Sequence, residues 1–182
     1  MKKRHRDQAL NELFGRLESS DFDRRENALF VLAILLRRAN HQPGGDDPLS
    51  AADLPRELAR IRLTRDEQGQ IVDRLIQLVV SRRESRASAF WALGEAAPGA
   101  GWEPVLQLLK ACGDQLEGEA AFQACRALRR WLTSGELGAE LVRRGIAAGD
   151  PQALLRNWSR ASDRRLKRAA QDLTDILNDA AQ

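Results

Sequence analysis

The fold is decided by the octapeptide Arg86-Ala-Ser-Ala-Phe-Trp-Ala-Leu93, because its pattern of small and large residues occurs again elsewhere in the chain. Arg25-Glu-Asn-Ala-Leu-Phe-Val-Leu32 and Ala121-Phe-Gln-Ala-Cys-Arg-Ala-Leu128 also carry alanine at the fourth position and leucine at the eighth. A looser copy runs from Leu166 to Leu173, again with alanine at its fourth position. Alanine lets one helix approach another closely, and leucine fills the space toward the next helix. We therefore expect each octapeptide to belong to a closely packed helix.

A leucine-rich helical segment precedes each of the three clear copies, so the pattern predicts pairs of helices. These segments contain Leu13 and Leu17 before the first copy, Leu75, Ile76 and Leu78 before the second, and Leu106, Leu108 and Leu109 before the third. The pairs resemble the HEAT-repeat family of helical solenoids, whose repeats of roughly 40 to 47 residues stack one on another. The resemblance covers most of the chain except residues 41–63, which form an insertion or loop between the first two copies.

The resemblance implies an all-α fold, namely a short α-solenoid of about four HEAT-like helical pairs, with antiparallel helices and no sheet. We expect a single domain over residues 1–182, because a chain of this length suits one core, with a basic tail at residues 1–6. The alternative is an irregular all-helical bundle in which the alanine-rich helices are alike by coincidence.

Apolar residues recur at helical spacing along almost the whole chain. The spacing predicts helices over 7–19, 22–40, a short segment near 55, 64–80, 83–97, 102–112, 117–133, 136–148, 151–161 and 163–179. Thr64-Arg-Asp-Glu67 has the form of a capping box. Asp21 or Asp23 suits the start of the second helix, and Ser162 or Asp163 suits the start of the last. Proline and glycine predict a turn over 94–101.

Histidine and cysteine are too few for the common catalytic and metal sites. The histidines are His5 and His41 and the cysteines are Cys112 and Cys125, whereas a zinc site needs about four such ligands close together. No glycine-rich phosphate-binding motif occurs. We therefore expect no enzyme activity, no cofactor and no metal. We expect the cysteines to be free, buried apolar residues, as in a reducing compartment.

The chain has no segment that suits a membrane. No apolar run approaches the roughly 20 residues that span a bilayer, and the basic amino terminus is followed by Asp7, Asn11 and Glu12 instead of a signal-peptide core. The sequence therefore predicts a cytoplasmic protein without a membrane partner.

Charge is distributed unevenly, although the formal net charge is only +3. Residues 126–168 hold eleven basic and four acidic side chains, whereas residues 87–125 hold one basic and five acidic side chains. Corresponding helices of a solenoid line the same surface, so the arginines are predicted to form a stripe. Such a stripe suits a phosphate backbone or an acidic protein partner, and it also suits a merely solvated face.

The candidate binding surface combines these arginines with two tryptophans beside them. It consists of Arg126, Arg129, Arg130, Trp131, Arg156, Trp158, Arg160, Arg164, Arg165 and Arg168. Trp131 and Trp158 either stack a base or anchor a peptide, or else they cap the core. We expect Trp91 in the core or a seam, and Trp102 partly covered.

Two functions follow from these features. The first is a non-catalytic protein–protein interaction scaffold, an adaptor subunit of a larger bacterial-type assembly that holds a protein partner. The second is a nucleic-acid-binding accessory subunit whose C-terminal arginines contact the DNA or RNA backbone.

The family resemblance implies a third, less favoured function. Some HEAT-like proteins are alkylpurine DNA glycosylases, with arginines on the DNA backbone and tryptophans and an aspartate around the extruded nucleotide. Trp131 and Asp163 are available here, but no Trp–Asp pair shares one helix face.

Overall fold

The computed structural model describes residues 3–40, 54, 58, 61–135, 140, 144 and 150–179. Every regular element in these ranges is a helix, so the predicted all-α fold class is confirmed. The elements are α1 (Lys3–Leu17), α2 (Phe22–Asn40), α3 (Arg65–Ser81), η2 (Arg83–Ser85), α4 (Arg86–Leu93), α5 (Pro98–Cys112), η3 (Gly113–Gln115), α6 (Gly118–Leu132), α8 (Asp150–Trp158) and α9 (Arg164–Asp179). The predicted helix over 136–148 and most of the segment 41–63 lie outside the described residues.

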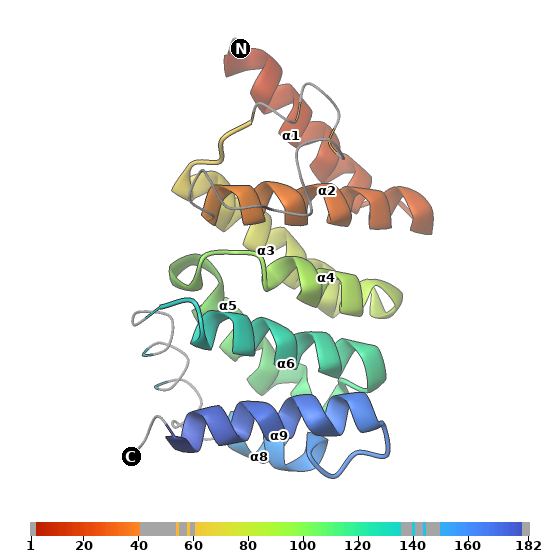
Figure 1. Cartoon of the computed structure of the whole chain (residues 1–182). Coiled ribbons are helices and arrows are strands. Elements are labelled where there is room, and N and C mark those ends of the chain that lie inside the picture. The colour runs from red at the N-terminus through yellow and green to blue at the C-terminus, as the bar shows by residue number, and fades with distance from the viewer. Residues whose placement is uncertain are drawn as a thin grey trace.

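The helices are stacked in two layers. In the first layer α2 packs on α4, α4 on α6 and α6 on α9, as the front of Figure 1 shows. In the second layer α3 packs on α5 and α5 on α8. Contacts between the layers join α3 to α4, α5 to α6 and α8 to α9, and α1 packs on α2. The result is an elongated stack with the N-terminus at one end and the C-terminus at the other (Figure 1).

The octapeptides occupy corresponding places in the first layer. Their fourth-position alanines and eighth-position leucines are all buried, namely Ala28, Ala89, Ala124, Leu32, Leu93 and Leu128. In the looser copy Leu173 is buried, whereas Ala169 is only partly buried at the edge of the core. The backbone of α4 ends so close to α6 that a Cβ built on Gly94 would lie 3.0 Å from the Cα of Ala127. Small residues therefore allow the close approach that the pattern predicts.

The arginines at the first position of two octapeptides hold neighbouring helices together. Arg25 is only 1% exposed, and its guanidinium donates hydrogen bonds of 2.8 Å each to Ser85 Oγ, to the carbonyl oxygen of Ser19 and to Glu84 Oε1. Arg86 takes the same position in the next copy and donates a 2.8 Å hydrogen bond to a backbone oxygen of α3. This structural role of the leading arginine was not predicted from the sequence.

Helix starts agree with the capping motifs. The side chains of Thr64 and Glu67 form the reciprocal bonds of a capping box at the start of α3. Asp21 Oδ1 accepts a 3.1 Å hydrogen bond from the backbone N–H three residues later, at the start of α2. Asp163 Oδ1 accepts bonds of 2.8 and 3.3 Å from the first turn of α9. These three predictions are confirmed, because a cap depends only on residues that are close in sequence.

The predicted turn over 94–101 is too long. α5 begins at Pro98, where a proline without an N–H is tolerated in the first turn. Gly101 is therefore helical, and a Cβ at this position would lie 2.8 Å from Cζ2 of Trp131. Gly101 therefore makes room for the indole of Trp131 and does not end a helix.

The basic tail and the insertion were both predicted to lie outside the helix pairs, but their described residues are part of the folded structure. α1 begins at Lys3, so the described part of the basic tail is helical and is not a separate extension. Within the insertion 41–63, the described residues Leu54, Leu58 and Ile61 are buried in the same core cluster as the helix pairs. This part of the insertion contributes to the core.

Candidate binding surface

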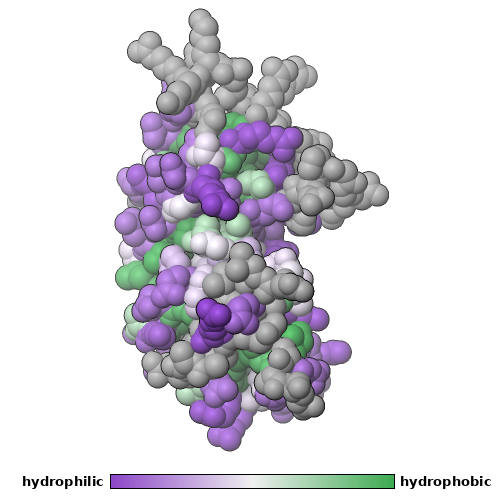
Figure 2. All heavy atoms as spheres, turned by 90° about the vertical axis from the view of Figure 1, so that its left-hand side faces the viewer, coloured by the Kyte–Doolittle hydropathy of each residue, from purple (hydrophilic) through white to green (hydrophobic). Residues whose placement is uncertain are grey.

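The structure divides the predicted arginine stripe between the two layers. Arg126, Arg129 and Arg130 lie on α6, and Arg164, Arg165 and Arg168 lie on the adjacent α9, all in the first layer. Arg156 lies on α8 in the second layer, and Arg160 follows the end of that helix. Each of these side chains is at least partly exposed. On the side seen in Figure 2, hydrophilic residues are spread along the whole length and do not gather in one band.

The two tryptophans of the predicted surface are in the core, so their assignment to a binding surface is wrong. Trp131 is 1% exposed and Trp158 is 6% exposed. The indole N–H of Trp131 donates a 2.9 Å hydrogen bond to the backbone oxygen of Ala96. Trp131 follows the buried Leu128 by three positions, so both lie on one helical face. Both indoles are buried, so neither side chain is free to stack a base.

Three arginines of the surface pair with carboxylates on neighbouring elements. The pairs are Arg130 with Glu95, Arg165 with Glu119 at 3.3 Å, and Arg129 with Asp172 at 3.7 Å. Glu95 and Glu119 belong to the acidic segment 87–125, which the stack brings against the basic segment that follows it. In the folded chain, acidic side chains of residues 87–125 therefore neutralise part of the positive charge of the basic segment.

Arg130 has a structural role as well as a surface position. Its partner Glu95 is buried, with only 3% of the side chain exposed, whereas the arginine is 40% exposed. A buried carboxylate without a partner is costly, because it has lost its water. Arg130 therefore neutralises Glu95 at the turn between α4 and α5, and only the remainder of its guanidinium faces solvent.

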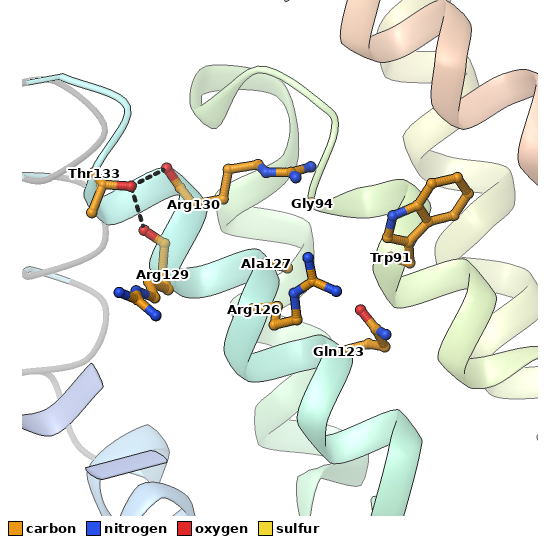
Figure 3. A pocket seen from close by; sticks show the side chains of 8 residues that line it. All are labelled: Trp91, Gly94, Gln123, Arg126, Ala127, Arg129, Arg130 and Thr133. Atoms are coloured by element: carbon orange, nitrogen blue, oxygen red, sulfur yellow. Dashed lines mark hydrogen bonds between the residues drawn. The ribbon is translucent and has the colours of Figure 1, made fainter. Parts of the chain in front are cut away.

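A cavity of about 270 Å³ lies between α4 and α6. Its lining residues are Trp91, Gly94, Gln123, Arg126, Ala127, Arg129, Arg130 and Thr133. Figure 3 shows that Arg126 and Gln123 extend from α6 toward Trp91, whereas Arg129 points away on the other side of α6. None of the lining residues is acidic, so the cavity favours an anion over a cation.

An aromatic pair continues this cavity onto α2. The rings of Phe30 and Trp91 are stacked, with centroids 5.9 Å apart and an interplanar angle of 19°. Phe30 is 36% exposed and Trp91 is partly exposed. Arg126 is exposed, lies 5.9 Å from the ring centre of Phe122, and has no ion pair among the described residues. The site thus offers a flat apolar surface next to a guanidinium available to a ligand.

Phe30, Trp91 and Arg126 are the sixth residues of the three octapeptides, and we call them the sixth-position ridge. The ridge was missed because Trp91 was expected in the core or a seam. The signal was present in the repeats, since equal positions of stacked helices line one surface. The fourth position of each octapeptide is a small, buried alanine, whereas the sixth position is an aromatic or basic residue.

Both cysteines and Asp163 lie among the described residues. Burial raises the pKa of the Cys125 thiol to about 12. Burial also raises the pKa of Cys112, although the charge of Arg86 lowers it in part. Neither thiol is an activated nucleophile. Asp163, the aspartate considered for a glycosylase, is engaged as the N-cap of α9.

The described residues contain no group of three or more His, Cys, Asp or Glu side chains that could hold a metal ion. Within the same ranges, no helix combines the length and the hydrophobicity that crossing a bilayer requires. Comparison of the chain with protein-family models and with curated proteins gives no match.

Proposed function

We propose that this chain is a HEAT-like helical-repeat protein that acts as a non-catalytic scaffold or adaptor and binds a protein partner through its first layer. The observation that carries the proposal is the sixth-position ridge. Phe30, Trp91 and Arg126 come from three successive helices of one layer and stand beside a cavity. Aromatic residues and arginine are the types most enriched in the central part of protein interfaces.

Support for a repeat protein comes from the equivalence of positions. The first position is a hydrogen-bonded arginine in two copies, the fourth is a buried alanine in all three, and the sixth is an outward side chain in all three. An irregular bundle gives no reason for such equivalence, whereas stacking of similar units does. A cytoplasmic location is part of the proposal, because two free cysteines suit a reducing compartment.

The test is selection of binders from a random peptide display library on the immobilised full chain. We expect the wild-type chain to enrich a set of peptides. The Trp91→Ala variant should capture these peptides about ten-fold less well, which is the loss typical of a hot-spot aromatic residue. Val80→Ala is the matched control, because Val80 is an exposed apolar residue on α3, away from the ridge. Failure to enrich any peptide, or equal capture by both variants, contradicts the proposal.

A nucleic-acid-binding subunit is the second candidate, and one observation favours it. Arg164, Lys167 and Arg168 line one open surface of α9 and have no ion pair among the described residues. Asp172 and Asp175 line the same surface, which weakens its attraction for phosphates.

Binding of labelled single-stranded DNA and RNA at about 50 mM and about 500 mM salt tests this candidate. Strong salt dependence, with further loss of affinity in Arg164→Gln, supports it, and absent or salt-independent binding removes it. Arg130 is unsuitable for this test because its removal leaves the buried Glu95 unpaired.

A further inference from the structure

We propose that the groove between α4 and α6 binds an acidic peptide segment of the partner protein. In this arrangement a carboxylate contacts Arg126 while a neighbouring apolar or aromatic side chain packs on Trp91 and Phe30. The inference rests on the proposed protein-binding function and names the site and the chemistry of the segment that it recognises.

Charge complementarity gives the first step. Of the three arginines that line the groove, Arg130 is balanced by Glu95, and Arg129 lies 3.7 Å from Asp172 and points away from Trp91. Arg126 has no carboxylate partner among the described residues, and no acidic side chain lines the groove. A guanidinium binds a carboxylate through two parallel hydrogen bonds, so an acidic side chain is the fitting ligand.

The aromatic pair gives the second step. Trp91 lines the groove and stacks on the ring of Phe30, with 5.9 Å between the ring centroids. Both rings keep part of their surface exposed, so an apolar side chain that packs on them removes further apolar surface from water. One ligand segment that carries a carboxylate and an apolar group side by side satisfies both features.

The size of the groove gives the third step. A volume of about 270 Å³ is below the range of about 300 to 1,000 Å³ that is typical of cofactor and small-molecule pockets. It accommodates side chains that project from a peptide lying across the two helices. An extended segment therefore fits better than a bulky cofactor.

Neighbouring acids argue against a nucleic acid at this groove. Glu119 and Asp172 lie beside the arginines on α6 and α9, and their side chains are 48% and 44% exposed. A polyphosphate chain that followed the first layer past Arg126 would approach these carboxylates, whereas a short acidic peptide contacts Arg126 alone. The neighbouring carboxylates therefore favour a short acidic peptide over a nucleic acid at this groove.

The experiment takes peptides enriched on the full wild-type chain and measures their affinity by fluorescence polarisation. We expect the enriched sequences to place Asp or Glu beside Phe, Leu or Trp. Affinity should fall about ten-fold in Arg126→Gln, because a hydrogen bond to a charged group is lost. Arg65→Gln is the matched control, since Arg65 is an exposed arginine on α3 in the other layer, and the affinity of this variant should be unchanged.

Two further variants separate binding from folding. Trp91→Ala should also weaken binding about ten-fold, and Trp91→Phe should restore most of it, because a phenyl ring keeps a flat apolar surface. Thermal unfolding followed by circular dichroism identifies any variant whose helices are lost. Arg126→Gln alters an exposed side chain and is the decisive variant if Trp91→Ala unfolds.

Failure of this inference differs from failure of the proposed function. The acidic-segment inference is overturned if the enriched peptides are basic or uncharged, or if they bind Arg126→Gln as tightly as wild type. Either result is still compatible with a protein-binding scaffold. Displacement of the peptides by single-stranded oligo-dT in wild type but not in Arg126→Gln overturns the acidic-segment inference in favour of a nucleic acid. Absence of any enriched peptide overturns both.

Discussion

Arg25 has an environment that is unusual for a guanidinium, since only 1% of the residue is exposed. Its three hydrogen bonds reach Ser85, Ser19 and Glu84, and its charge lies 5.7 Å from the ring centre of Phe22. A buried charge is retained only where its donors are satisfied. Arg25 therefore fixes α2 against the start of α4.

Replacement of Arg25 by alanine is expected to lower the free energy of unfolding by about 2 to 3 kcal/mol. The change leaves the hydroxyl of Ser85 and the carbonyl oxygen of Ser19 without their donor, and it opens a cavity. Glu84 is half-exposed and is rehydrated, which keeps the loss below that of a fully buried ion pair. Urea unfolding measures the effect. Arg24→Ala, at an exposed neighbour, is the control, and equal stability of the two variants contradicts the assignment.

The buried thiol of Cys125 is expected to react slowly in the native chain. The pKa of Cys125 is raised to about 12 by burial, above the value of about 8.5 for an unfolded cysteine. Folding therefore favours the protonated thiol, so its contribution to stability is complete below about pH 8.5 and is lost as the pH rises toward 12. In Cys112→Ser at about pH 8, a thiol reagent should label the native chain far more slowly than the urea-unfolded chain. Equal labelling rates would show that Cys125 is accessible.

At the scale of the element, local signals were predictive and distant packing was not. The capping box at Thr64 and the cap at Asp163 were predicted because each bond joins residues two or three positions apart. The extent of α5 was not, because Gly101 is helical beneath Trp131, a residue of a different helix. Prediction of the binding surface is limited in the same way, because it also depends on packing between distant helices. The exposure of Arg126 follows from its helical position, but the pairing of Arg165 with Glu119 depends on how α9 packs on α6.

The glycines of α5 provide a matched pair of substitutions. A Cβ on Gly101 would lie 2.8 Å from the Trp131 ring, whereas a Cβ on Gly99 has no atom within 4 Å. Gly101→Ala is expected to lower the free energy of unfolding by about 1 to 3 kcal/mol because the indole must move. Gly99→Ala should leave the free energy unchanged or raise it by up to about 1 kcal/mol, since alanine favours a helix. Thermal unfolding compares the two, and a Gly101→Ala protein as stable as Gly99→Ala contradicts the described contact.

Across the whole molecule, stacking decides which charges and rings meet. The first layer brings α2, α4, α6 and α9 together, so three arginines meet carboxylates from other parts of the chain and are partly neutralised. The same stacking aligns the sixth-position ridge of Phe30, Trp91 and Arg126. The sequence predicted a basic surface. At the sixth-position ridge, the arrangement places one arginine without an ion pair among the described residues beside two aromatic rings.

The most direct test of the central claim, that the sixth-position ridge is the binding surface, is an NMR titration of the full chain with a selected peptide. The indole N–H signals of Trp91, Trp102, Trp131 and Trp158 report on four places in one spectrum, and Trp91→Phe assigns the ridge signal. We predict that the Trp91 signal moves on binding, while the signals of the buried Trp131 and Trp158 stay in place. Movement of Trp131 or Trp158 with an unchanged Trp91 signal would contradict the account.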